Sequence, residues 1–132
     1  MPLIPEFDDV SRRVLVRGSG VLRLDEIQAL IRTVRADVDH RMWPMLVDAQ
    51  GATTDMVDAD IARLAAAVQK AVETQGPRGH VAIVADDDVL YERMLAYETK
   101  CAALGIRVIR VFRQRADAAQ WLDVVVASRN FS

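Results

Sequence analysis

The residues best suited to chemistry lie in one stretch, WPMLVDAQGATT, between Trp43 and Thr54. A short apolar run ends there in the carboxylate of Asp48, and a glycine and two threonines follow it. A buried strand that runs into such a loop presents backbone amides, hydroxyls and a carboxylate at the edge of a sheet. We therefore predict a binding loop from Asp48 to Thr54. Its candidate residues are Asp48, Gln50, Gly51, Thr53 and Thr54.

Two other segments follow apolar runs in the same way: Gly18-Ser19-Gly20 and Asp86-Asp87-Asp88. Ligands of open α/β sheets gather at the carboxyl ends of the strands, so we add Gly18, Ser19, Asp86 and Asp87 to the candidate site. Two acidic strand ends are able to hold a hard divalent cation. The interpretation that we rank first is structural: the aspartates cap the following helix, and Asp48 accepts bonds from loop amides. We expect no metal.

The catalytic and cofactor motifs that this pattern suggests are incomplete. Arg23 occupies the position of the third glycine of a dinucleotide fingerprint, and a G-x-S-x-G turn is absent. The spacing of His40, His80 and Cys101 does not suit zinc. Arg113 and Arg115 offer an anion grip before the last helix, but we rank a solvated charged loop ahead of it. We expect neither an enzyme nor a cofactor.

The composition limits the classes of protein. A chain of 132 residues that is 52% hydrophobic and 27% charged fits one globular domain over residues 1–132. The net charge of −2 supplies no basic field for nucleic acid. The single cysteine excludes an intrachain disulfide, and no apolar run approaches the roughly 20 residues of a membrane span. The N-terminus lacks the features of a signal peptide, so we expect a cytoplasmic protein without a transmembrane segment.

Strand and helix patterns alternate along the chain. Strands are expected at 3–7, 14–16, 45–47, 80–85 and 106–112, and helices at about 24–40, 61–72, 90–104 and 116–127. This order predicts an α/β fold with a mixed, mostly parallel five-stranded sheet, an N-terminal hairpin and four helices. Pro5 indicates that the first strand lies at an edge or is broken there. Arg107 and Arg110 indicate that the last strand is a partly solvated edge strand.

Helical spacing also predicts which side chains face the core. In the first helix Val38 belongs to the apolar face, whereas Arg32, Arg35 and Asp39 lie on the other. In the third helix Cys101 falls on the apolar face. We therefore expect a buried cysteine and solvated arginines.

Several segments together are similar to a known family: MLVDAQG, VAIVAD, MLAYE and the ending VIRVFRQRADAAQWL. Over nearly its whole length the chain resembles the SpoIIAA-like branch of the STAS domains, also described as STAS/SEC14-type and related to anti-sigma-factor antagonists. The resemblance implies a phosphorylatable serine in a D-S-x-G loop. This chain has Ala49 there, which has no hydroxyl, so only Thr53 and Thr54 offer nearby sites for phosphorylation.

The resemblance and the loop lead to three expectations of function. The first is a non-enzymatic cytoplasmic binding or regulatory module that contacts a protein partner through the loop after the middle strand. The second, implied by SEC14-type folds, is a carrier or sensor of a small apolar or lipid-like ligand. Met56, Val57, Met94 and Leu95 are the candidate pocket residues, and a filled core explains them equally well. An enzyme that uses Asp48 ranks third. A homodimer through the last strand or last helix is compatible with the apolar run at 124–126.

Overall fold

A mixed five-stranded sheet forms the centre of the molecule in the computed structural model, which describes residues 3–130. Its strand order is β1-β2-β4-β6-β7; β1 is antiparallel to β2, and every other neighbouring pair is parallel. The predicted α/β fold with its N-terminal hairpin is confirmed. The strands are β1 (Leu3–Asp8), β2 (Arg13–Gly18), β4 (Met45–Asp48), β6 (Val81–Val84) and β7 (Ile109–Phe112).

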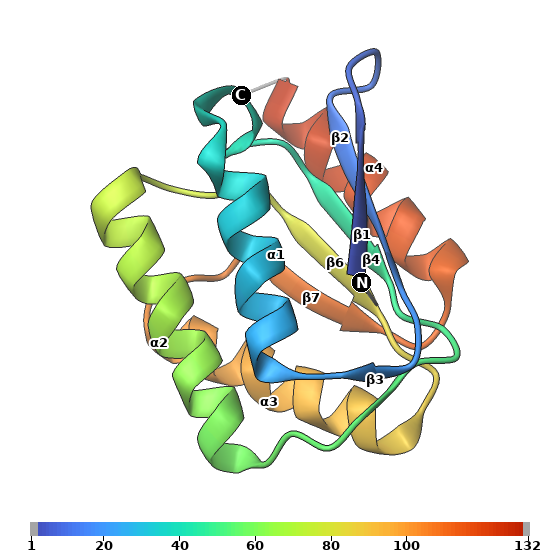
Figure 1. Cartoon of the computed structure of the whole chain (residues 1–132). Coiled ribbons are helices and arrows are strands. Elements are labelled where there is room, and N and C mark those ends of the chain that lie inside the picture. The colour runs from blue at the N-terminus through green and yellow to red at the C-terminus, as the bar shows by residue number, and fades with distance from the viewer. Residues whose placement is uncertain (1–2, 131–132) are drawn as a thin grey trace.

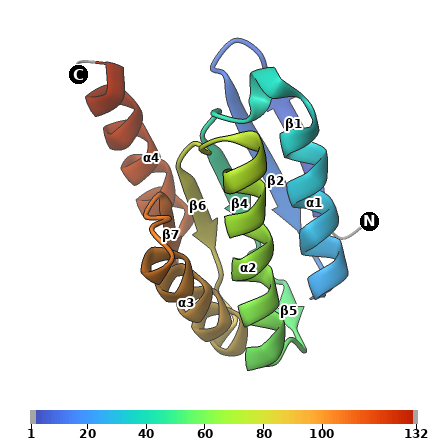
Figure 2. The ribbon, with the colours of Figure 1, turned by 90° about the vertical axis from the view of Figure 1, so that its left-hand side faces the viewer.

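Helices cover both faces of this sheet (Figures 1 and 2). Each crossover from β2 to β7 moves one place in the same direction, and crossovers between parallel strands are right-handed as a rule, so the first three helices pack on one face. The fourth helix packs on the other face, against β4, β6 and β7. No helix within residues 3–130 has both the length and the apolar composition of a membrane span. The helices are α1 (Leu24–Ala36), α2 (Asp58–Gln75), α3 (Asp88–Ala103) and α4 (Arg115–Asn130).

The core is divided by the sheet into two parts. Alternate residues of β6 point to opposite faces, so Val81 and Ile83 join the larger core under α1 to α3. Ala82 and Val84 join a smaller core under α4, with Ala118 and Leu122 as its other buried members. All four residues of β6 are buried, as expected for a parallel strand covered on both sides.

Both edge-strand predictions are confirmed. Within residues 3–130, β1, which contains Pro5, pairs only with β2, and β7 pairs only with β6. Arg107 and Arg110 are exposed, which is possible because β7 has a free edge. Cys101 is fully buried in α3, as predicted.

The structure departs from the predicted elements most clearly at the end of the first helix, at the start of the last strand and in one additional pair of strands. The first helix ends at Ala36 rather than at residue 40, because the Asp37 carboxylate accepts a hydrogen bond from the Asp39 amide at 2.9 Å and starts a short 3₁₀ turn (Val38–His40). Val38, expected in the core, is 66% exposed. The last strand begins at Ile109 rather than Ile106. A small parallel pair, β3 (Val21–Leu22) and β5 (Thr53–Thr54), was not predicted.

Arg35 is the side chain whose predicted placement differs most from the structure. The helical pattern predicts a solvated arginine, but its side chain is only 3% exposed. Its Nη2 donates to the carbonyl of Gly76 at 2.6 Å, and its Nε donates to Gln75 Oε1 at 3.2 Å. The arginine therefore links α1 to the end of α2, a contact that helical spacing alone does not reveal.

Candidate functional site

The predicted site residues gather at one edge of the sheet. β2, β4, β6 and β7 run parallel, so their carboxyl ends and following loops meet there (Figure 1). The Thr53 amide donates to the carbonyl of Gly20 at 2.9 Å, and the Gly51 amide donates to Asp86 Oδ1 at 2.8 Å. Three loops that are distant in the sequence are thus joined by hydrogen bonds.

Asp48 orders the start of the central loop. One of its carboxylate oxygens accepts a hydrogen bond from the Gln50 amide at 3.1 Å. The other lies 3.2 Å from Nη1 of Arg115, at the start of α4. The side chain of Asp48 is only 14% exposed, so the ion pair is better shielded from water than a typical surface pair.

Asp86 and Gly51 hold the tip of the loop. Gly51 has a φ of +81°, a conformation that favours glycine, and its amide points at the Asp86 carboxylate. Gln50, Gly51 and Asp86 are all exposed. The loop therefore combines a fixed backbone with an accessible tip.

The two threonines differ in their availability. The hydroxyl of Thr54 donates to the carbonyl of Leu22 at 2.7 Å and accepts from the Met56 amide at 3.1 Å. Thr53 is exposed, and its hydroxyl has no hydrogen-bond partner among residues 3–130. Of the two, only Thr53 presents a free hydroxyl.

Asp87 and Gly18 have structural roles. Asp87 caps α3, accepting a hydrogen bond from the Leu90 amide at 3.0 Å through Oδ2. Gly18 is buried at the end of β2, where an added Cβ would lie 3.2 Å from Leu3 and 3.5 Å from the Cβ of Ala49. Ser19, the remaining predicted residue, is exposed beside it.

The arginines after β7 take part in this edge. Nη1 of Arg113 donates to Asp88 at 2.7 Å and to the carbonyl of Asp86 at 3.1 Å, and the guanidinium lies 4.0 Å from the ring centre of Tyr91. Arg115 is paired with Asp48. From the sequence, a solvated charged loop ranked ahead of an anion grip for these arginines, and the contact of Arg113 with Tyr91 was not predicted.

The edge carries a shallow depression of about 280 Å³ lined by Gly51, Ala52, Thr53, Asp86 and Asp87. Its polar atoms are backbone groups, one hydroxyl and two carboxylates. Among residues 3–130, no group of three histidine, cysteine or acidic residues is arranged to hold a metal ion. The depression thus offers polar contacts without a preformed metal centre.

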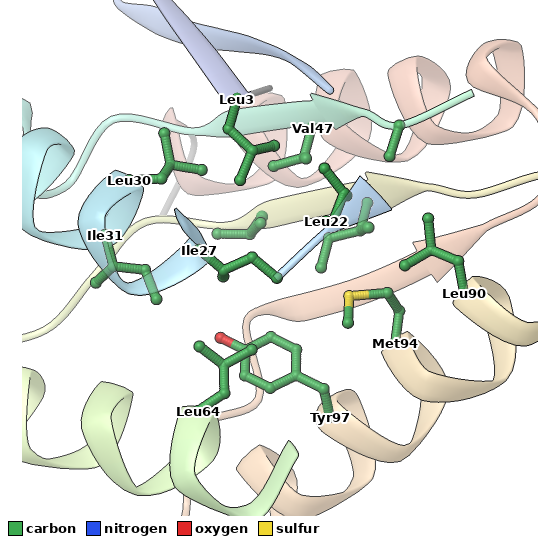
Figure 3. Close-up of a pocket in the computed structure, with 13 residues that line it drawn as sticks. Leu3, Leu22, Ile27, Leu30, Ile31, Val47, Leu64, Leu90, Met94 and Tyr97 are labelled. Carbon is green, nitrogen blue, oxygen red and sulfur yellow. The ribbon is translucent and has the colours of Figure 1, made fainter. Parts of the chain in front are cut away.

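A separate apolar cavity of about 50 Å³ lies between the sheet and α1 to α3 (Figure 3). Of the four residues predicted to line a pocket, Met94 lines this cavity; Val57 is exposed, and Met56 and Leu95 lie outside the lining. Leu22, Ile27 and Tyr97 also face it. Burial raises the pKa of the Tyr97 hydroxyl well above its ordinary value, so this side chain is neutral at physiological pH.

No protein-family model matches the chain, and no curated protein matches it significantly.

Proposed function

We propose that the protein is a non-enzymatic binding module that contacts a partner protein through its loop face, defined as Ser19, Gln50, Gly51, Thr53 and Asp86. The observation that carries the proposal is the hydrogen bond of 2.8 Å between the Gly51 amide and Asp86, which fixes two exposed loops against each other. A surface ordered before binding loses less conformational entropy when it meets its partner.

The partners of the acidic side chains argue against catalysis. Asp48 is engaged with Arg115 and a loop amide, Asp87 caps α3, and Asp88 pairs with Arg113. A general base needs a free carboxylate within reach of a bound substrate. Each aspartate of this edge already has a partner, which supports a recognition role.

The shape of the loop face favours a macromolecular partner. Small-molecule pockets are concave and mostly apolar, whereas the depression here is shallow and polar. The N-terminal hairpin and mostly parallel sheet agree with the STAS-type resemblance, which stays a proposal. We also propose a cytoplasmic location, in keeping with a single, buried, unpaired cysteine.

Site-specific photo-crosslinking tests this function. A photoreactive amino acid replaces exposed Gln50 in one variant and Val10, which is 98% exposed in the distant β1–β2 turn, in the control. Both proteins are irradiated in extract of the source cells. We expect one discrete protein adduct at Gln50, absent at Val10 and suppressed when Thr53→Arg is added. Adducts of equal yield at both positions, or none at Gln50, would refute the proposal.

The apolar cavity favours a second candidate, a carrier of a small apolar ligand. Ligand pockets for drug-sized molecules measure roughly 300–1,000 Å³, so a cavity of about 50 Å³ admits only a molecule of a few heavy atoms unless α1 moves away from the sheet. Native mass spectrometry of gently purified protein tests this candidate. A non-covalent adduct that is lost on denaturation would support it, and a bare polypeptide mass would count against it.

The denatured sample in the same measurement reports on phosphorylation. We propose Thr53 rather than Thr54 as the acceptor, because the Thr54 hydroxyl is occupied by Leu22 and Met56. A covalent phosphate that maps to Thr53 is the expected result if the module is switched. A phosphate on Thr54 would contradict this assignment.

A further inference from the structure

A basic groove lies between α1 and α2, remote from the loop face. Its volume is about 600 Å³, and Figure 2 shows the two helices that form its sides. The side chains that line it include three cations, from Arg32, Arg35 and Lys70, and no carboxylate. Alanines on the facing surfaces of both helices keep the space open.

Arg35 is a buried guanidinium with an unused donor. Its Nε and Nη2 donate to Gln75 and Gly76, but its Nη1 has no hydrogen-bond partner among the residues that the structure describes. A buried charge is costly unless it is paired and its donors are satisfied. The two bonds to the end of α2 account for Nε and Nη2 of Arg35. They do not explain the buried, unpartnered Nη1.

Further positive charge surrounds Arg35. The Nε of Arg41 donates to the backbone carbonyl of Arg35 at 2.8 Å. Burial lowers the pKa of the Arg35 guanidinium, and the charges of Arg78 and Arg41 lower it further. Within residues 3–130, none of Arg32, Arg35, Arg41, Lys70 and Arg78 forms an ion pair with a carboxylate.

Arg78 repeats the pattern of Arg35. It follows the end of α2, and its Nε and Nη1 are buried without a hydrogen-bond partner in the described part of the chain. Arg78 does not line the groove, and its guanidinium interacts with Tyr97 of α3. Its contribution to the groove is its positive charge, which acts on Arg35.

We propose that the α1–α2 groove binds a phosphate group, with Arg35 as its central ligand and Arg32 and Lys70 at its entrance. A guanidinium presents planar paired donors that match phosphate oxygens, and a doubly charged group needs more than one cation. The volume of the groove leaves room for the organic part of a phosphate ester. The phosphate belongs either to a soluble molecule or to a lipid headgroup.

Titration with inorganic phosphate tests the site directly. Amide chemical shifts of labelled protein report both affinity and location. We expect saturable shifts at the groove residues of α1 and α2, and about tenfold weaker binding in the double variant Arg32→Gln/Lys70→Gln. Both of these residues are exposed, so the fold should survive the change. Arg35→Lys, which keeps the charge but loses the planar donors, should weaken binding by a similar factor.

Arg63→Gln is the matched control, because Arg63 lies exposed on α2 outside the groove. Its affinity for phosphate should equal that of the wild type. Shifts that do not saturate, or equal affinity in the wild type and the groove double variant, would overturn the proposal.

Vesicles distinguish the two sources of phosphate once the ion is seen to bind. Phosphatidylcholine vesicles are compared with and without phosphatidic acid in a sedimentation assay. Retention that requires phosphatidic acid and is lost in Arg32→Gln/Lys70→Gln identifies a lipid headgroup. Phosphate binding without retention identifies a soluble phosphate ester. Failure of this site leaves the loop-face proposal intact, because the crosslinking test probes another surface.

Discussion

Three aspartates of the candidate site have three different structural roles. Asp48 pairs with an arginine that is 67 residues away, Asp86 accepts the amide of a glycine 35 residues away, and Asp87 caps its own helix. Only the last of these contacts is local. Each carboxylate therefore has its own expected response to substitution.

Removing the Asp86 side chain should loosen the loop face without unfolding the protein. In Asp86→Ala the Gly51 amide loses its acceptor, so we expect its hydrogen exchange to accelerate about fivefold. The free energy of unfolding should change by less than about 1 kcal/mol, because both groups are exposed. Asp88→Ala is the control. An unchanged exchange rate at Gly51 would show that this bond does not order the loop.

Gly79 should tolerate no side chain. An added Cβ would lie 2.7 Å from the backbone carbonyl oxygen of Trp43 and against that of Met42, neither of which can swing away. We expect Gly79→Ala to lower the free energy of unfolding by about 2 kcal/mol or more, measured by urea denaturation. The comparison is Gly105→Ala, in open space at a φ of +87°, which should cost about 1 kcal/mol. Equal losses would contradict the steric argument.

Burial of two weak acids should make the fold sensitive to alkali. Burial raises the pKa of Cys101 and of Tyr97, so the folded state holds both protons at a pH where the unfolded state releases them. Their contribution is complete below about pH 9 and is lost as the pH rises further. We expect the free energy of unfolding to fall above that pH, and to fall less steeply in Tyr97→Phe. Identical slopes in wild type and variant would exclude this linkage.

At the scale of elements, α3 connects the candidate site to the core. Its first turn is capped by Asp87 at the loop edge, and Met94 and Tyr97 from its next turns face the apolar cavity. The helix ends at Ala103, and beyond it the Ile106 amide donates to the Cys101 carbonyl at 2.9 Å. Loss of the Asp87 cap should therefore destabilise α3 as well as the loop edge.

Loss of the cap is the prediction for this element. Asp87→Ala removes the acceptor of the Leu90 amide and should lower the free energy of unfolding by about 1 kcal/mol. Asp88→Ala, which removes only an exposed pair with Arg113, should cost less than half as much. Chemical denaturation of both variants decides the point. A larger loss of unfolding free energy in Asp88→Ala than in Asp87→Ala would show that Asp87 is not the residue that caps α3.

Helices and strands could be predicted from the sequence where a local pattern of apolar and turn residues marks them. Periodicity and turn residues were enough for the five strands and four helices of the main fold. The end of α1 was missed because Val38 continues the apolar spacing, whereas Asp37 ends the helix. β3 and β5 were missed because two-residue strands leave no pattern. The sequence also placed the site loops and Arg113 at one edge. It did not predict the pairs Arg113–Asp88 and Arg115–Asp48, because the partners come from distant segments.

The whole molecule is two cores that share one sheet. The larger core includes Trp43 among its packed side chains, and the smaller core under α4 includes Trp121. Because β6 contributes alternate residues to both, neither core can come apart without disturbing the other. The two tryptophans thus report on opposite faces of one structure.

Single-tryptophan variants test this coupling. Trp43→Phe leaves fluorescence from the α4 side, and Trp121→Phe leaves it from the side of the larger core. We expect each variant to show the same urea midpoint by fluorescence as by circular dichroism. A fluorescence midpoint for Trp121 well below the circular dichroism midpoint of the same variant would show that α4 detaches first.

The strand order bears on how the chain assembles during synthesis. From β1 to β7 each new strand of the main sheet joins the edge formed by the one before it, so no strand has to insert between two that are already paired. A nascent chain emerging from the ribosome is therefore able to lengthen its sheet stepwise, always against a template already made. α4 is translated after every strand of the main sheet, and until it packs, the face with Ala82 and Val84 stays uncovered. From the synthesis of β6 until α4 has packed, this apolar face is therefore open to chaperones and to aggregation.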